Sequence, residues 1–246
     1  MSGPLASKSI VIIGGTGGIG LSAAMACISA GANVIAVGRS AEKAEQAQRE
    51  LGEAACIYVG DAMVPTTAEA AIQLALDQFG RFAGLYHVAG GSGRSRGDGP
   101  LHQITDEGWR HTLDFNLTSL FYSNRAAVRQ LLAQKTAGSI LNVGSVLDFS
   151  PAPEHFATHT YATTKAGAVG FTKAAAAYYA RDNIRFNVLA PALVATPLAQ
   201  RAMNDPAIMQ YIATKQPIDG GRISTPEDLD AAVVFFLSDQ SKFVTG

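Results

Sequence analysis

The sequence predicts an α/β domain in which one doubly wound parallel sheet carries helices on both of its faces. Three observations lead to this fold class. Ile10–Ile13 is a run of apolar, β-branched residues without alternation, which is typical of a strand buried on both faces. Apolar strands and helical segments then alternate along the whole chain. No internal repeat or linker divides the sequence, so residues 1–246 are expected to form a single domain.

The first crossover joins that strand to a helix at Leu21–Ala30 through a turn, Gly14–Gly20, with five glycines in seven residues. Glycines let the backbone approach a ligand without Cβ clashes, and a helix start offers free N–H donors to a phosphate. Gly15, Gly17 and Gly20 match the dinucleotide fingerprint in its strand–turn–helix context. We therefore expect a dinucleotide site; the alternative is a tight packing turn that binds nothing.

The remaining elements follow from caps and apolar runs. Ser40 and Gly52 suit the two ends of one helix. Thr66 and Glu69 have the spacing of a capping box, and Gly80 ends that helix. The expected strands are Val34–Val37, Ala55–Val59, Leu85–Ala89, Ser139–Val143 and Arg185–Leu189, and further helices are expected at Ser40–Leu51, Asp106–Lys135, Tyr161–Ala180 and from about Pro226.

Composition narrows the function classes. A net charge of −1 argues against nucleic acid as the main partner. Cys27 and Cys56 are expected to be reduced, and no basic-then-apolar leader opens the chain, which favours the cytoplasm. Residues 9–38 carry no charge, but the glycine turn and Asn33 divide them, so no membrane span is predicted. No two histidines have metal-ligand spacing on a helix, and no metal is expected.

The end of the second strand bears on cofactor preference. NAD-binding units place an Asp or Glu there, where it binds the 2′-hydroxyl of the adenosine ribose. Here Gly38 takes that place and Arg39 follows. The planar donors of an arginine match a 2′-phosphate, so NADP(H) is favoured over NAD(H). The alternative is that Arg39 is a solvated charge at the end of a strand.

Tyr161 and Lys165 are four residues apart and share one face of a predicted helix. A nearby ammonium lowers the pKa of a phenol, so the pair can act as a general acid/base near neutral pH. Ser145 follows the strand that ends at Val143 and can donate to a substrate oxygen, because ligands of such sheets bind at the carboxyl ends of strands. Taken singly, the two features also fit a surface pair and a turn serine.

Together these residues resemble the short-chain dehydrogenase/reductase family, in its compact single-domain branch, over nearly the whole chain. The family's T-G-x-x-x-G-I-G corresponds to Ile13–Gly20, its adenine-contacting aspartate to Asp61 and its helix asparagine to Asn116. Its serine corresponds to Ser145, its Y-x-x-x-K to Tyr161–Lys165, and its N-x-x-x-P-G-x-x-x-T-P to Asn187–Pro197. The resemblance implies a Rossmann-type fold and a homo-oligomer, either a tetramer or a dimer.

The resemblance also implies site roles. Hydride would pass between the nicotinamide and a carbonyl carbon, Ser145 would hold the carbonyl oxygen and Tyr161 would protonate it. Lys165 would bind the nicotinamide ribose, and Asn116 would hold a water that relays protons. The cofactor-binding residues would be Gly14, Thr16, Gly17, Gly18, Ile19, Gly20, Arg39, Ser40, Asp61, Ala62, Ala89, Gly90, Tyr161, Lys165, Pro191, Val194 and Thr196.

Four positions depart from the family pattern. Ile13 replaces the threonine that ties the glycine loop to the neighbouring strand, and Ala192 replaces a glycine beside the nicotinamide. The usual N-N-A-G is His87–Gly90, so the hydrogen bonds of two amides are lost or remade. His87 either remakes them or is an inert core histidine. None of these changes removes a catalytic group.

The substrate side is less well determined by the sequence. The segment between Ser145 and Tyr161, with its prolines and histidines, is expected to rim the pocket, and residues 193–221 are expected to form a lid. The Gly90–Pro100 loop is expected to be mobile. Its Arg94 and Arg96 either attract an anionic substrate tail or are solvated loop charges.

The expected function is the NADP(H)-dependent reduction of a small-molecule ketone to a secondary alcohol, or the reverse reaction. One alternative is an NAD-linked alcohol or sugar dehydrogenase. Another is a catalytically silent, NADP(H)-binding sensor or scaffold, against which the intact tetrad speaks. The substrate stays open, because one fold and one tetrad support many chemistries.

Overall fold

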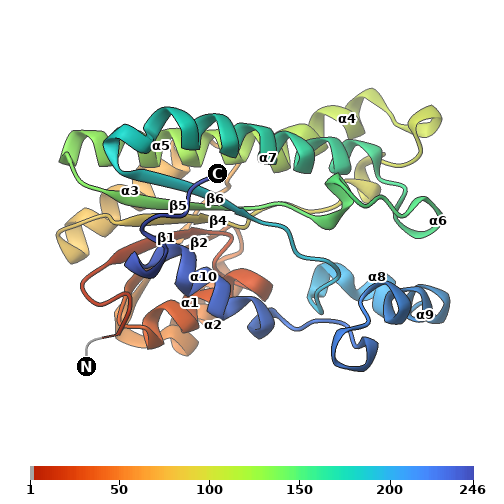
Figure 1. Cartoon of the computed structure of the whole chain (residues 1–246), viewed down its shortest axis with the longest axis horizontal. Coiled ribbons are helices and arrows are strands. Elements are labelled where there is room, and N and C mark those ends of the chain that lie inside the picture. The colour runs from red at the N-terminus through yellow and green to blue at the C-terminus, as the bar shows by residue number, and fades with distance from the viewer. Residues whose placement is uncertain (1–2) are drawn as a thin grey trace.

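The computed structural model describes residues 3–246, which form a parallel six-stranded sheet between two layers of helices (Figure 1). The strand order is β3-β2-β1-β4-β5-β6, so the direction of winding reverses between β1 and β4. Ligands of such sheets bind at the carboxyl ends of the strands beside that reversal. The strands are β1 Ser9–Ile13, β2 Asn33–Gly38, β3 Ala55–Val59, β4 Gly84–His87, β5 Gly138–Val143 and β6 Ile184–Leu189.

Two helical layers cover the sheet, which confirms the doubly wound α/β prediction. Alternate residues of β1 enter different cores: Ile10 and Ile12 pack toward one layer, and Val11 and Ile13 toward the other. This explains why the strand is apolar throughout. One layer holds α1 (Gly18–Ser29), α2 (Ala41–Leu51) and α10 (Asp230–Leu237); the other holds α3 (Thr67–Phe79), α4 (Asp106–Leu113), α5 (Ser119–Gln134) and α7 (His159–Tyr179).

Some local predictions need correction. The first helix begins at Gly18, inside the glycine turn, not at Leu21. The capping box at Thr66 and Glu69 is wrong: Thr66 has helical backbone angles and makes no side-chain cap bond. The helices predicted across residues 106–135 are α4 and α5, and a π-helical turn at Asp114–Thr118 lies between them. The caps at Ser40 and Gly52 are present, since Ser40 accepts from the Lys43 N–H.

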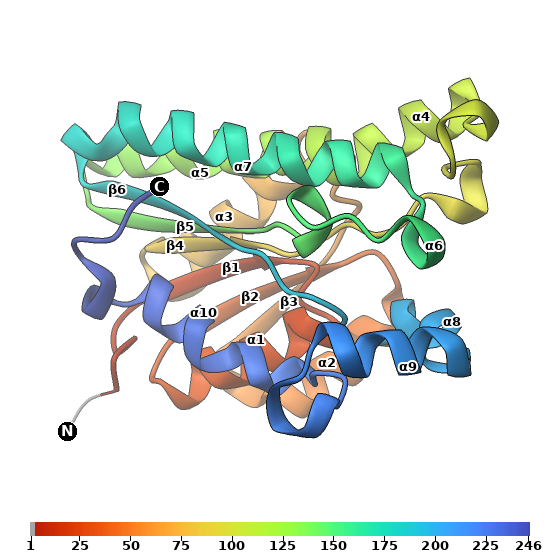
Figure 2. The same ribbon diagram turned by 45° about the vertical axis from the view of Figure 1, so that its right-hand side comes forward.

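A separate helical segment lies beside the carboxyl ends of the strands (Figure 2). It contains α8 (Gln200–Met203) and α9 (Pro206–Lys215), which pack together around Ala202, Ile208 and Ile212. The short helix α6 (Pro153–Phe156) reaches this cluster through Phe156. Across residues 3–246, no helix combines the length and the apolar character that a bilayer span requires.

Candidate active site

A crevice with a volume of about 460 Å³ lies at the carboxyl ends of the central strands. It opens where the winding of the sheet reverses between β1 and β4. Every residue that the sequence assigned to the cofactor lines it, from the glycine turn through Asp61 and Gly90 to Thr196. Ser145 also lines it, whereas Asn116 lies behind its wall.

The glycine turn has the geometry that a close ligand needs. Gly14 adopts a φ of +93°, which L side chains rarely adopt. A Cβ on Gly20 would collide with the Gly14 carbonyl oxygen, so this glycine lets α1 approach the strand closely. By contrast, a Cβ on Gly17 would meet no atom within 4 Å. The turn therefore has room on the crevice side and none on the sheet side.

The turn is tied to β2 without the usual threonine. The N–H groups of Gly14 and Gly15 both donate to the Val37 carbonyl oxygen, each at 2.9 Å. Ile13 is buried in the core and takes no part in this tie. At the start of α1, Gly17 supplies no side-chain cap and the first turn holds no acidic residue. The free N–H groups and positive dipole end of this helix suit a pyrophosphate.

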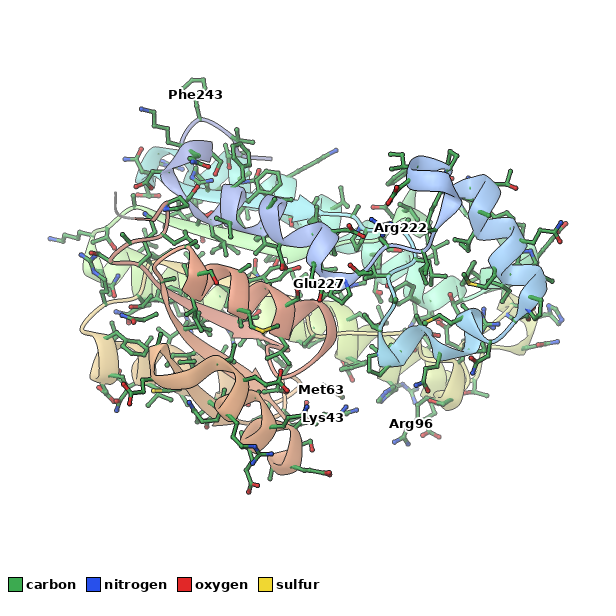
Figure 3. The ribbon with its side chains drawn as sticks, turned by 90° about the horizontal axis from the view of Figure 1, so that it is seen from below. Lys43, Met63, Arg96, Arg222, Glu227 and Phe243 are labelled. Carbon is green, nitrogen blue, oxygen red and sulfur yellow. The ribbon has the colours of Figure 1, made fainter. Side chains whose placement is uncertain are left out.

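Two cations stand near the end of β2. The Arg39 guanidinium lies over the Phe115 ring, 5.6 Å from its centroid, on the border of the crevice. Lys43, at the start of α2, lines the same crevice and was missed by the sequence reasoning (Figure 3). A Cβ on Gly38 would collide with the Thr16 side chain, which leaves little room there for an acidic residue.

Tyr161, Lys165 and Ser145 converge at the inner end of the crevice. The Lys165 ammonium is buried, donates to the Val143 carbonyl oxygen at 2.9 Å and lies 5.5 Å from the Tyr161 ring centroid. The Ser145 hydroxyl lies close enough to the Tyr161 side chain to lower the pKa of the phenol. It also accepts from the Leu147 N–H at 3.2 Å, so this serine caps a turn as well.

Burial is the largest influence on the pKa values of Tyr161 and Lys165. Burial raises the pKa of the Tyr161 hydroxyl, and the nearby Ser145 hydroxyl lowers it less. The lysine was expected to lower this pKa, but Lys165 is not among the groups that shift it, and burying a phenolate raises it. Burial also lowers the pKa of Lys165 to about 8. At neutral pH the phenol therefore holds its proton, which is the form that a general acid requires.

Asn116 connects the site to the loop after β4. Its amide nitrogen donates to the carbonyl oxygens of Gly91 and Thr112, at 3.0 and 2.9 Å, and its amide oxygen accepts from the Gly91 N–H at 2.9 Å. Gly90 has a φ of +148°, and a Cβ there would lie 2.6 Å from the Asn116 oxygen. The residue sits in the π-helical turn, a feature frequent at functional sites.

Comparison with known proteins agrees with this geometry. Residues 14–246 match the sequence model of a family described as Enoyl-(Acyl carrier protein) reductase. The chain belongs to the short-chain dehydrogenase/reductase family. It is therefore an oxidoreductase of a family that acts on CH–OH groups with NAD(P).

Named relatives of this dehydrogenase/reductase act on diverse molecules. The chain is 32% identical to a 2,5-dichloro-2,5-cyclohexadiene-1,4-diol dehydrogenase from Sphingobium indicum, over 98% of this chain and 94% of the relative. It is 34% identical to 3beta-hydroxysteroid dehydrogenase 1 from Eggerthella lenta, over 98% and 91%. A solved short-chain type dehydrogenase/reductase from Mycobacterium ulcerans superposes with a TM-score of 0.89 at 28% identity, covering 98% of this chain and 86% of that one.

One buried carboxylate fastens the helix that carries Tyr161 in this dehydrogenase/reductase. Asp98 accepts from the N–H groups of Gly99 and Thr160 through one oxygen, at 2.8 and 3.0 Å, and from the Tyr161 N–H through the other at 3.0 Å. It acts as the cap of α7, whose own Thr158 makes no side-chain cap bond. The sequence reasoning missed Asp98, because more than sixty residues separate it from the helix.

His87 is part of a buried polar network below the crevice. Its Nδ1 lies 2.8 Å from the Ser123 hydroxyl, and its Nε2 lies 3.5 Å from that of Ser119. Burial, followed by the charge of Lys165, lowers the pKa of His87 to about 3, so the ring is neutral at ordinary pH. His87 is therefore a neutral core histidine whose ring is hydrogen-bonded to α5.

A second cavity of about 380 Å³ adjoins the crevice and shares Ser145 and Tyr161 with it. Its inner wall includes apolar side chains from several segments, among them Leu147, Phe156 and Leu193. Arg94 lines this cavity, whereas Arg96 does not. His159 is exposed and does not line it either, although His155 lies next to Phe156 on the rim.

Proposed function

We propose that this protein is an NADP(H)-dependent oxidoreductase that interconverts a ketone and a secondary alcohol, with Tyr161 as the general acid/base. The observation that carries the proposal is the meeting of two cavities at one point. Ser145 and Tyr161 line both, while Lys165 lines only the crevice assigned to the cofactor. A substrate oxygen in the second cavity would thus meet two hydroxyl groups next to the reactive end of the crevice.

Each residue has a role that its contacts allow. The bound nicotinamide would supply or accept a hydride. Ser145 would donate to the carbonyl oxygen, and Tyr161 would transfer its proton to the same atom as the alcohol forms. Lys165, held by the Val143 carbonyl, would bind the ribose hydroxyls of the nicotinamide and keep a positive charge beside the phenol. Asn116 would hold a water on a proton route to solvent.

The crevice favours NADP(H) over NAD(H). The place where NAD-specific units carry an acidic residue is Gly38, and a larger side chain there would strike Thr16. Arg39 and Lys43 both line this end of the crevice. Two cations suit a 2′-phosphate better than a 2′-hydroxyl.

Three further expectations remain proposals. Residues 193–221 would act as a lid, because they cover one side of the substrate cavity with their own small apolar cluster. The chain would form a homo-oligomer, a tetramer or a dimer, for which the part-exposed Trp109 and Phe121 offer apolar surface. Sedimentation analysis would measure the assembly. The cytoplasm would suit the two free cysteines, Cys27 and Cys56.

The function is tested by following the consumption of NADPH and NADH with a panel of ketones, diketones, quinones and β-ketoacyl thioesters. We expect turnover of at least one carbonyl class, with a higher kcat/KM for NADPH than for NADH. Tight NADPH binding with no turnover on the whole panel would instead support a sensor or scaffold. A higher kcat/KM with NADH would support the NAD-linked alternative.

A further inference from the structure

Three cations line the substrate cavity, and each comes from a different segment of the chain. Arg94 belongs to the loop after β4, Arg201 to α8 and Lys215 to the end of α9. The reactive hydroxyls of Ser145 and Tyr161 line the same cavity. Apolar side chains make up much of the remaining wall. The cavity therefore combines a hydroxyl pair, an apolar wall and a cationic group.

These cations are positioned by the protein but not neutralised by it. Arg94 and Arg201 both donate to one carbonyl oxygen, that of His155, at 3.3 and 3.1 Å. Lys215 donates to the Ser150 hydroxyl at 2.7 Å. In the described part of the chain, none of the three forms an ion pair with a carboxylate.

Arg222 shows what a neutralised arginine looks like in the same molecule. It lies outside the substrate cavity and is held between the carboxylates of Asp219 and Asp228 (Figure 3). Those two contacts use donors on both sides of its guanidinium. Arg94 and Arg201 have no such partners, as is true of most cations in the described residues, and what distinguishes them is that both line the cavity that holds Ser145 and Tyr161.

The two guanidinium groups are also close enough to oppose each other. Burial lowers the pKa of Arg94, and the charge of Arg201 lowers it further. Asp98 acts in the opposite direction, but both of its oxygens accept from backbone N–H groups at the start of α7. An anion between Arg94 and Arg201 would relieve this repulsion, and their unused N–H donors would bind it.

We propose that the substrate carries a carboxylate, which Arg94 and Arg201 bind while its ketone or alcohol oxygen lies at Ser145 and Tyr161. Lys215 adds charge at the rim of the same cavity. The apolar wall contacts the body of the molecule between its two polar ends. Two arginine forks match the planar oxygens of a carboxylate. This inference names the substrate class of the proposed function and rests on it.

Arg96 provides the matched control. It lies two residues from Arg94 in the same 3-10 turn and is exposed, as Arg94 is, but it does not line the cavity (Figure 3). A general attraction of anions to this basic turn would depend on both Arg94 and Arg96. Binding inside the cavity would depend on Arg94 and Arg201 but not on Arg96.

The kinetic test uses methyl-ketone acids that differ in length and rigidity, 6-oxoheptanoate, 7-oxooctanoate and 4-acetylbenzoate, each beside its neutral primary amide. We expect a higher kcat/KM for at least one acid than for its amide. Arg94→Ala and Arg201→Ala should each lower the kcat/KM of that acid about 10- to 100-fold, mainly through KM, which is the range for loss of a charge-assisted hydrogen bond. The kcat/KM of the amide should change less than threefold in both variants. Arg96→Ala should leave the kcat/KM of the acid and of the amide unchanged.

A binding test separates this inference from the proposed function. Titration calorimetry with octanoate and 4-isopropylbenzoate, beside their amides, needs no turnover. We expect tighter binding of a carboxylate than of its amide, and loss of that difference in the Arg94→Ala/Arg201→Ala double variant, whose thermal melting verifies folding. A protein that reduces ketones but treats acids and amides alike in both assays overturns the carboxylate site alone. Arginine-dependent binding without turnover on any ketone overturns the function alone.

Discussion

The two halves of the active site differ in how the chain builds them. Much of the cofactor crevice is formed by turns that directly follow strands of one sheet, and residues of α7 and of the segment 191–198 complete it, so many neighbours in space are neighbours in a regular sheet. The substrate cavity is assembled from segments that lie far apart in the sequence, among them the loops around Arg94 and Leu147 and the helices α6, α8 and α9. The first half is fixed by the sheet itself, whereas the second depends on how loops fold over its edge.

This difference explains what each half can vary. A shift in the glycine turn would disturb backbone hydrogen bonds to β2 and the packing of α1. A change in the substrate segments alters wall side chains without touching the sheet. The relatives, which are named for a chlorinated cyclohexadienediol and a hydroxysteroid, share this chain's family but not a common substrate name. Binding and catalytic specificity commonly reside in loops on a rigid scaffold.

Tyr161 belongs to both halves, and its loss should have the largest effect. Tyr161→Phe removes the hydroxyl and keeps the ring, so kcat should fall by about 10³-fold or more, within the range for loss of a general acid. NADPH affinity should stay within about threefold, because the phenol oxygen transfers a proton rather than holding the nucleotide. Steady-state kinetics and fluorescence titration of NADPH measure the two. A variant with near wild-type turnover would remove Tyr161 from the mechanism.

Two glycine variants test the rigidity of the cofactor half. Gly20→Ala places a Cβ against the Gly14 carbonyl oxygen, so we expect a loss of several degrees in Tm together with loss of NADPH binding. Gly17→Ala meets no protein atom and should keep the wild-type Tm, while its methyl group weakens NADPH binding about tenfold. Differential scanning fluorimetry and NADPH titration separate the pair. Equal Tm values for the two variants would contradict the tight packing of the glycine turn at Gly20.

Asp98 tests whether the substrate half positions the catalytic helix. Asp98→Ala removes the acceptor for the N–H groups of Thr160 and Tyr161, so we expect a stability loss of about 1–2 kcal/mol and a fall in kcat of about tenfold. Asp98→Asn keeps one carbonyl oxygen and should recover part of kcat. Chemical denaturation and steady-state kinetics report the two effects.

Thr105 supplies the control for that variant. Its hydroxyl caps α4, a helix that carries none of the proposed catalytic residues, by accepting from the Gly108 N–H at 2.9 Å. Thr105→Ala should therefore lower stability by a similar amount with kcat unchanged. If the two alanine variants lose kcat in equal proportion, Asp98 acts only through general stability and does not position Tyr161.

An Arg39 variant is expected to change cofactor specificity without affecting the substrate cavity. Arg39→Asp replaces the proposed donor to a 2′-phosphate by an acceptor for a ribose 2′-hydroxyl, so the ratio of kcat/KM for NADPH over NADH should fall about tenfold or more. The preference for the substrate should not change, because Arg39 lies in the crevice and not in the substrate cavity. An unchanged cofactor ratio would assign Arg39 to solvent and leave Lys43 as the remaining determinant.

We expect the smallest effect on activity for His87, which lies below the cofactor crevice. Its substitution changes how the stability of the protein depends on pH. Its pKa is about 3 in the folded protein and near its usual value when unfolded, so below about pH 6.5 the unfolded chain binds more protons. This contribution therefore lowers stability as the pH falls from about 6.5 toward 3. We expect the Tm of the wild type to drop more between pH 7 and 5 than that of His87→Asn. If the Tm of the wild type and of His87→Asn fell by the same amount between pH 7 and 5, His87 would not contribute to the pH dependence of stability.

The same division decides what the sequence could predict. The strands, the doubly wound sheet and the crevice residues follow from local patterns: an unbroken apolar run in β1, glycines at Gly14–Gly20, and Tyr161 and Lys165 one helical turn apart. The π-helical turn at Asn116 leaves no local signal of that kind. Asp98 and Arg201 were not found, because their partners lie far away in sequence and only the folded loops bring them together.

The direction of the pKa shift of Tyr161 could not be predicted from the sequence either. The spacing of Tyr161 and Lys165 predicted a lowered phenol pKa from the charge alone. The direction reverses because burial, which a spacing does not report, is the larger effect. Lys165 is itself fully enclosed and its pKa moves down to about 8. The chemistry of the pair depends on how much water the surrounding fold excludes.

Transfer of deuterium from NADPH with both hydrogens at C4 of the nicotinamide replaced by deuterium to the most rapidly reduced ketone tests the mechanism most directly. We predict one deuterium on the carbon that bears the new hydroxyl group in the wild type, and no product beyond background with Tyr161→Phe. A product without deuterium at that carbon, or a Tyr161→Phe protein that forms labelled product at the wild-type rate, would contradict hydride transfer assisted by Tyr161.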